Sequence, residues 1–234
     1  MRTLKTSYII ISVLILAASA VGPDISAQSK KRDLAQMPLK DVLLEDENID
    51  QLLARFSFAY NLPLGFELAR GDGEPSFYRI DFKKGTLSDL LNQFVTEHNE
   101  YSWRIEDGVL NVFPKEDYRD PIIRELLETK IRSFSVAEQT TTMKFGENLF
   151  ASPKIKRILK LYGISCDTGY IGGFYIQQLG RRYSFHASNM QLKSILDRVV
   201  KESPAAQNWI MGNDGSAQKL FLRVNARLEY AQNP

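Results

Sequence analysis

The sequence predicts an α+β fold built from two small units, each with the element order α-β-β-α-β-β and each packing a small sheet against helices. Residues 78–95 (YRIDFKKGTLSDLLNQFV) align without a gap with residues 183–200 (YSFHASNMQLKSILDRVV) at a constant offset of 105 positions. In both segments a strand pattern is followed by apolar residues at helical spacing. Each segment is then followed by a tryptophan and by an Asp-Gly pair between apolar runs, which is typical of a β-hairpin. A pattern repeated over this length indicates a repeated structural unit.

The first unit is predicted from alternating helix, strand and turn signals. Apolar residues at steps of three and four give the first helix one buried face, and the proline at position 63 ends it. Thr86, with Asp89 three residues later, is a capping signal for the second helix. The expected elements are a helix over 48–60, strands over 64–68 and 77–82, a helix from 86 to 97, and hairpin strands over 101–105 and 109–113.

The second unit repeats these signals with more interruptions. Pro153 opens an amphipathic helix that Gly163 ends. Ser188 with Gln191 predicts a capping box at the start of the repeated helix. The expected elements are a strand over 131–136, a helix over 152–162, strands over 174–178 and 183–187, a helix that includes 192–200, and hairpin strands over 207–211 and 220–224.

The N-terminus has the three parts of a secretory signal peptide. Arg2 and Lys5 are followed by the apolar residues 8–18 and by the small residues Ala18-Ser19-Ala20. This apolar stretch is shorter than the roughly 20 residues that a spanning helix needs, so we expect no stable membrane span after cleavage. The expected organisation is a signal peptide over 1–20, a flexible leader over 21–38, the first unit over 39–114, a linker over 115–130 and the second unit over 131–234. The expected location is the periplasm or the outside of a Gram-negative cell.

Composition argues against several function classes. Hydrophobic residues make up 44% and charged residues 25%, which is typical of a globular chain. The formal net charge is only +2, and the basic runs 30–32 and 181–182 are short, so we expect no nucleic-acid partner. Cys166 is the only cysteine, so the exported protein forms no internal disulfide, and we expect an inert thiol there.

The repeated motif resembles the short N-terminal domain of secretins and TonB-dependent receptors. In the first unit it reads Ile80-Asp-Phe-Lys-Lys-Gly-Thr-Leu-Ser-Asp-Leu-Leu, followed by Tyr101-Ser-Trp103 and Val109-Leu-Asn-Val112. In the second unit it covers residues 185–196, followed by Asn208-Trp209. The resemblance implies a non-enzymatic periplasmic protein that works through protein–protein contacts. No channel or barrel pattern follows the second unit, so we expect neither pore formation nor receptor signalling.

No residue pattern indicates catalysis, a metal or a cofactor. Ser165, Asp167 and His186 could form a nucleophilic triad, but no G-x-S-x-G motif accompanies them. His98 is the only other histidine, and a structural role is expected for both. No metal-ligand spacing and no phosphate-binding glycine loop is present in the sequence.

Aromatic residues supply the interaction candidates. Trp103 and Trp209 start the two predicted hairpins, and their equivalent places favour packing against the repeated helix over a sugar- or peptide-binding platform. Tyr170, Phe174 and Tyr175 lie in a glycine-flanked stretch with no counterpart in the first unit, and we expect them at an interface.

Two functions follow from these observations. The first is an exported, non-enzymatic interaction module that binds an envelope protein, for example by pairing at the edge of a small sheet. The alternative is an envelope hydrolase or glycan-binding protein with its site between the two units.

Overall fold

The computed structural model describes residues 33–71, 77–137, 140–167, 183–204, 206–214 and 219–226, which belong to one compact unit over Asp33–Pro234. No helix of these residues is long and apolar enough to cross a membrane. The first half contains β1 (Pro38–Asp46), α1 (Ile49–Ala59), β2 (Leu64–Glu67), β3 (Tyr78–Thr86), α2 (Leu87–Glu97), β4 (Tyr101–Glu106) and β5 (Val109–Pro114). The second half contains α3 (Pro121–Glu128), β6 (Lys130–Val136), α4 (Thr142–Phe150), α5 (Pro153–Tyr162), β7 (Ser165–Asp167), β8 (Phe185–Gln191), α6 (Leu192–Glu202), β9 (Ala206–Asp214) and β10 (Lys219–Ala226).

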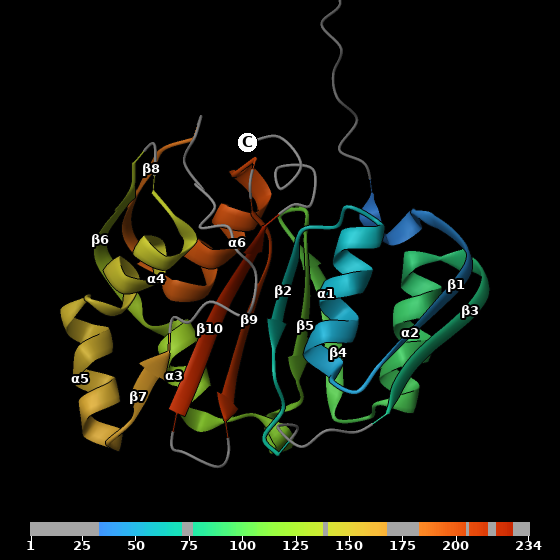
Figure 1. Ribbon diagram of the computed structural model, residues 1–234, viewed down its shortest axis with the longest axis horizontal. Coiled ribbons are helices and arrows are strands. Elements are labelled where there is room, and N and C mark those ends of the chain that lie inside the picture. The colour runs from blue at the N-terminus through green and yellow to red at the C-terminus, as the bar shows by residue number, and fades with distance from the viewer. Residues whose placement is uncertain are drawn as a thin grey trace, which may run out of the picture. The chain divides into compact units, whose positions relative to one another are not determined.

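The α+β class that the sequence predicts is confirmed, but the strands form three sheets instead of one small sheet in each unit. A six-stranded sheet in the order β4-β5-β2-β9-β10-β7 combines strands of both halves. Two antiparallel pairs, β1-β3 and β6-β8, form separate small sheets. Figure 1 shows β1-β3 on one side and β6-β8 on the other, with helices between each pair and the six-stranded sheet.

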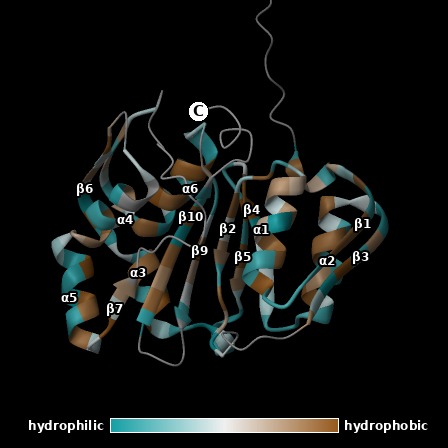
Figure 2. Ribbon diagram, viewed as in Figure 1, coloured by the Kyte–Doolittle hydropathy of each residue, from teal (hydrophilic) through white to brown (hydrophobic). Residues whose placement is uncertain are grey.

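Two hydrophobic cores lie on opposite faces of the six-stranded sheet. Residues alternate between these faces along β9: Trp209 and Met211 belong to one core, and Ile210 belongs to the other. Helices α1 and α2 cover the face of Ile210, whereas α3, α5 and α6 contribute to the opposite core. The hydrophobic residues of the sheet strands are brown in Figure 2. The two halves therefore share one sheet but place their helices on opposite sides of it.

Strand order and direction are the same in the two halves. In the first half β4 pairs antiparallel with β5, and β2 pairs parallel with β5. In the second half β9 pairs antiparallel with β10, and β7 pairs parallel with β10. The small sheets also correspond, because Pro38 pairs with Thr86 and Lys130 pairs with Gln191, and each of these partners precedes a helix. By these relations β4 corresponds to β9, and β2 corresponds to β7.

Local signals explain most of the elements in the first half. Thr86 and Asp89 form the expected capping box, with Thr86 Oγ1 accepting from Asp89 N at 3.2 Å and Asp89 Oδ2 accepting from Thr86 N at 2.8 Å. Asp107 and Gly108 have φ values of 52° and 84°, as a two-residue primed turn requires. The predicted hairpin is therefore present, with strands β4 and β5.

The structure corrects the predicted cap of the repeated helix. Gln191 is the N-cap residue of α6, and its side chain makes no capping hydrogen bond. Ser188 instead lies within β8, where it pairs with Ser133. The repeated helix therefore starts without the side-chain cap that Thr86 provides in the first half.

Several elements are additional to those predicted. Strand β1 precedes the first helix, as the predicted strand β6 precedes α4 and α5 in the second half. The range 115–130, predicted as a linker, contains α3, whose Ile123, Leu126 and Leu127 are buried. Helix α4 lies where the sequence gives no clear periodicity. The core thus extends into α3 and α4, which have no counterpart in the first half.

Candidate interaction edges

The two tryptophans make equivalent contacts with the two repeated helices. Trp103 Nε1 donates to Asn92 Oδ1 of α2 at 3.1 Å, and Trp209 Nε1 donates to Asp197 Oδ1 of α6 at 2.8 Å. Asn92 and Asp197 occupy the same position in the aligned segments. Trp209 is only 2% exposed, whereas Trp103 is half-buried. Both indoles therefore pack on the repeated helix, as expected, but only Trp209 is fully covered.

The covering of Trp209 comes from the parallel pairing of β2 with β9. Residues 64–67 pair with residues 208–211, so that Gly65 lies opposite Trp209. A Cβ atom at position 65 would meet Trp209 Cε2 and Cζ2 at 2.6 Å and Asn111 Oδ1 at 2.7 Å. Glycine is therefore required here because the indole passes directly over the neighbouring backbone. This pairing joins the two halves of the sheet.

Polar contacts from α1 reinforce the same junction. Asn208 Nδ2 donates to Ser57 Oγ at 3.3 Å, and both residues are fully buried. Arg223 of β10 pairs with Asp50 at the start of α1. Helix α1 thus packs over strands of the other half as well as its own. The junction is a filled interface of paired backbone and buried side chains.

Two carboxyl groups lie beside the sheet, Glu67 buried and Asp197 half-buried. Burial raises the pKa of Glu67, although its two oxygens accept from Arg119 Nε and Nη2 at 2.7 Å and 2.9 Å. Burial also raises the pKa of Asp197, although Lys193 and the Trp209 indole favour its ionised form. Lys193 Nζ contacts Asp197 Oδ2 at 2.6 Å and Glu106 Oε2 at 2.9 Å, which links α6 to the end of β4.

Strand β4 is one terminal strand of the six-stranded sheet. Glu106 and Val109 flank a two-residue turn, so Glu106, Arg104 and Ser102 direct their backbone groups toward β5. Trp103 and Ile105 therefore turn their N–H and C=O groups to the outer side, where no strand of the described residues pairs with them. In the corresponding strand the carbonyl of Met211 accepts from Leu68 N at 2.9 Å. The outer side of β4 thus offers the hydrogen-bonding positions that β9 uses at the junction.

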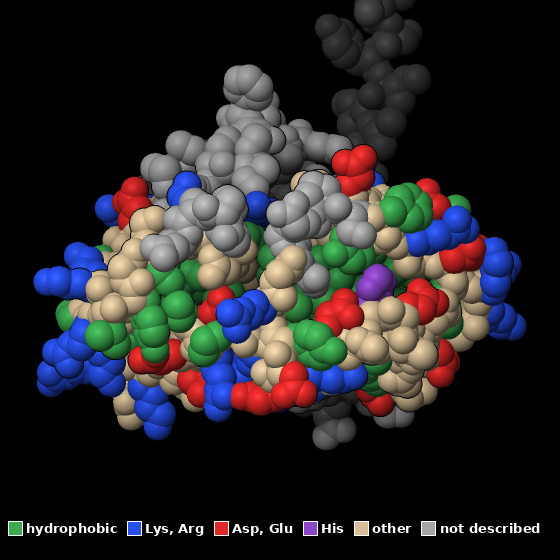
Figure 3. All heavy atoms as spheres, turned by 90° about the horizontal axis from the view of Figure 1, so that it is seen from below, with side chains coloured by type: hydrophobic (Ala, Val, Ile, Leu, Met, Phe, Trp, Pro, Cys, Tyr) green, Lys and Arg blue, Asp and Glu red, His purple; other side chains and the backbone are tan. Residues whose placement is uncertain are grey.

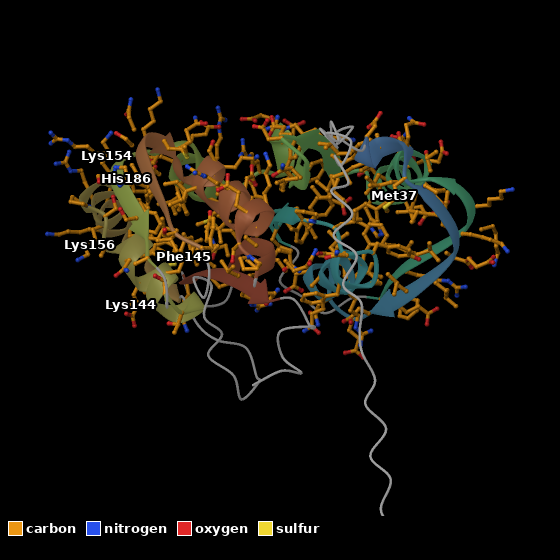
Figure 4. All side chains as sticks on the ribbon, turned by 90° about the horizontal axis from the view of Figure 1, so that it is seen from above. Met37, Lys144, Phe145, Lys154, Lys156 and His186 are labelled. Carbon is orange, nitrogen blue, oxygen red and sulfur yellow. The ribbon has the colours of Figure 1, made fainter. Side chains whose placement is uncertain are left out.

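Strand β7 forms the opposite end of the same sheet. Cys166 lies in this strand, half-buried, and pairs in register with Leu220 of β10. Helix α5 lies beside β7 and leaves Leu161 74% exposed and Tyr162 42% exposed. Lys154 and Lys156 of α5 point away from the sheet (Figure 4), and Lys and Arg side chains gather beside hydrophobic ones at this end (Figure 3). This edge therefore combines a short strand with an exposed apolar and basic helix surface.

The histidines occupy separate environments. His98 is the C-cap residue of α2, where its backbone N–H donates to Phe94 O. The centroid of its ring lies 4.7 Å from that of Phe94 and 5.5 Å from that of Tyr78. His186 is exposed on β8, and its Nδ1 lies 2.8 Å from Ser135 Oγ. Ser165 lies on β7 of the six-stranded sheet, whereas His186 lies in the small β6-β8 sheet. His98 thus contacts side chains of α2 and β3, whereas His186 contacts a side chain of β6.

Not all of the predicted candidates can be placed. Tyr170, Phe174 and Tyr175, the predicted interaction residues, lie outside the described residues, as does the strand predicted over 174–178. In the part of the chain that the structure describes, no group of three or more His, Cys, Asp or Glu side chains is arranged to hold a metal ion.

Sequence reasoning did not predict the difference between β4 and β9, which is that β9 pairs with β2 whereas β4 is a terminal strand of the sheet. The alignment shows that Trp103 and Trp209 correspond, but it does not show that β9 is covered by β2. The Leu64-Gly65-Phe66 segment carries the one available signal, because a glycine inside an apolar strand indicates a close approach of another group. Comparison of the chain with protein-family models, with curated proteins and with solved structures gave no match.

Proposed function

We propose that this chain is an exported, non-enzymatic interaction module of the cell envelope, which binds a protein partner by adding a strand to the outer side of β4. The observation that carries the proposal is the contrast between β4 and β9. The two strands hold the same place in their halves, and β9 is already paired in parallel with β2. Strand β4 presents the same outward backbone positions without a neighbour among the described residues.

Backbone pairing is a sufficient basis for such binding. An exposed sheet edge holds a partner strand through main-chain hydrogen bonds, and side-chain pockets add specificity. Trp103 supplies a half-buried aromatic surface next to the outward backbone of β4. Aromatic side chains of this kind are enriched among residues that dominate binding energy. The signal-peptide pattern and the resemblance to the short N-terminal domain of secretins support a periplasmic setting for this contact.

The test compares Ile105→Pro with Ile105→Val in the mature protein. Proline removes the outward N–H of residue 105 without removing a hydrogen bond to β5, whereas valine retains that N–H. Envelope proteins crosslinked to each variant would be quantified by mass spectrometry, after thermal unfolding has shown that both variants are folded. We expect a partner captured by the wild type and by Ile105→Val but lost with Ile105→Pro. Equal capture by the two variants would show that β4 is not the binding edge.

A further inference from the structure

The internal junction shows what a strand must carry to pair beside a tryptophan of this kind. Strand β2 runs parallel to β9, and Gly65 lies opposite Trp209. A Cβ atom at position 65 would lie 2.6 Å from Trp209 Cε2 and Cζ2, which is closer than non-bonded carbon atoms approach one another. The indole therefore occupies the space of a side chain on the neighbouring strand, and glycine is the residue that leaves this space free.

Trp103 is held on β4 in the same way as Trp209 is held on β9. Nε1 of Trp103 donates to Asn92 at 3.1 Å, and Nε1 of Trp209 donates to Asp197 at 2.8 Å. Asn92 and Asp197 occupy the same position in the aligned segments. Because the same indole atom contacts the same helix position, the two rings have corresponding orientations. A strand beside β4 would therefore meet the indole of Trp103 as β2 meets that of Trp209.

Backbone direction at β4 allows the same parallel pairing. Leu68 N donates to Met211 O at 2.9 Å across the junction, so Met211 and Trp209 turn their backbone groups toward β2. Trp103 and Ile105 hold the corresponding outward positions of β4, where no strand of the described residues lies. In a parallel ladder, such an outward residue bonds the two residues that flank its opposite. The residue opposite Trp103 is therefore selected by side-chain fit and not by hydrogen bonding.

We propose that the partner strand at β4 runs parallel to it and places a glycine opposite Trp103. This inference rests on the proposed function of β4 as the binding edge, and it names the chemical feature of the partner that the edge selects. The ligand is an extended protein segment with a glycine at one defined position. A larger residue there would have to displace the Trp103 indole from its hydrogen bond to Asn92.

The residues that flank this glycine meet a less demanding surface. Their side chains point to the opposite face of the sheet from Trp103, beside Ser102 and Arg104. At the internal junction the equivalent residues, Leu64 and Phe66, are fully buried in the core that α1 covers. The side chain of Arg104 is 50% exposed instead. Polar and apolar flanking residues are therefore both accepted at β4, and the glycine is the position that discriminates.

Peptides that differ at one position test the inference. The probe is a fluorescently labelled peptide with the sequence of residues 61–68, which contains the strand that the internal junction accepts. Its Gly65→Val form places a side chain against the indole, and its Leu64→Val form places valine on the opposite face. Fluorescence anisotropy with the mature protein should give similar affinities for the unchanged and Leu64→Val peptides. The Gly65→Val peptide should bind about tenfold more weakly, because its side chain overpacks against Trp103.

Variants of the protein provide the matched controls. In Trp103→Ala, with folding checked by thermal unfolding, the preference for glycine over valine in the peptide should fall to about twofold or less, because the excluding side chain is gone. Ile105→Pro should weaken binding of the unchanged peptide and Ile105→Val should not, which places the peptide at β4. A spin label on the peptide N-terminus should weaken the amide signal of Tyr101 more than that of Glu106, as parallel pairing requires.

Several results would overturn the inference. These are no binding of the unchanged peptide, binding that Ile105→Pro leaves intact, equal affinity for the glycine and valine peptides, a preference that survives Trp103→Ala, or a stronger spin-label effect at Glu106. If one of them occurs while Ile105→Pro still abolishes the capture of an envelope protein that Ile105→Val retains, the inference fails and the proposed function stands. If Ile105→Pro also leaves that capture unchanged, both fail.

Discussion

The indole of Trp209 donates to the carboxylate of Asp197 at 2.8 Å, and both residues recur as Trp103 and Asn92 in the first half of the chain. The same contact thus fixes a hairpin strand to the repeated helix twice. Its surroundings differ, because β2 covers Trp209 while the outer side of Trp103 faces no described strand.

Removal of the indole N–H should therefore have unequal effects at the two sites. Trp209→Phe leaves the half-buried carboxylate of Asp197 without one of its donors, so we expect a loss of about 1–3 kcal/mol in the free energy of unfolding. Trp103→Phe breaks a hydrogen bond between more exposed groups, and a loss below about 1 kcal/mol is expected. Urea unfolding of the two variants and the wild type measures both losses in the free energy of unfolding. Equal losses would contradict the difference in burial.

The junction predicts a strong effect at Gly65. Gly65→Ala should destabilise the protein by about 1–3 kcal/mol, because the new methyl group overpacks against Trp209 and Asn111. Combining it with Trp209→Leu should cost less than the two separate losses together, since the smaller side chain makes room for the methyl group. Urea unfolding of the four proteins gives the coupling energy. Strict additivity would indicate that Gly65 and Trp209 do not interact.

Helix capping offers a matched comparison within the chain. Thr86→Ala removes the capping box of α2 and should lower the free energy of unfolding by about 1 kcal/mol. Gln191→Ala alters the corresponding N-cap residue of α6. Because the Gln191 side chain makes no capping hydrogen bond, this substitution should change the free energy of unfolding by less than about 0.5 kcal/mol. Chemical denaturation compares them. A larger loss for Gln191→Ala would reverse the assignment of the two caps.

The buried carboxyl of Glu67 predicts a pH dependence with a defined sign. Burial raises its pKa in the folded state above the ordinary value of 4.5, so its contribution to stability is full below that pH and is lost as pH rises through the raised value. The free energy of unfolding of the wild type minus that of Glu67→Gln should therefore fall across this window and stay flat above it. An increase of the difference with pH would mean that the Arg119 pairing outweighs burial.

The Glu67–Arg119 pair also gives a control at a single, neutral pH. Arg119→Met should cost about 3–5 kcal/mol at neutral pH, because it leaves a buried carboxylate unpaired. The double variant Glu67→Met and Arg119→Met should regain much of this loss. If the double variant is as unstable as Arg119→Met alone, packing of the arginine stem explains the effect better than charge.

The sequence was most informative where local chemistry determines structure. The Asp107-Gly108 turn, the Thr86 cap and the left-handed Gly163 at the end of α5 were all predictable, because each depends on a few adjacent residues. Strand β1 was not, since Leu43 is exposed beside Leu44 and the alternation of apolar residues is lost. The pairing of β2 with β9 was not either, because it joins segments more than a hundred positions apart and depends on side-chain fit. The proposed interaction edge could therefore be recognised only by comparing β4 with β9 in the structure.

Amide exchange of β4 tests the central claim most directly. The exchange rates of the Trp103 and Ile105 amide protons would be measured by nuclear magnetic resonance without and with the peptide of residues 61–68. Strand addition at the outer side of β4 predicts slower exchange at these two amides, with little change at Ser102 and Arg104, whose amides already face β5. Unchanged exchange at Trp103 and Ile105 in the presence of excess peptide would contradict the assignment of β4 as a strand-accepting edge.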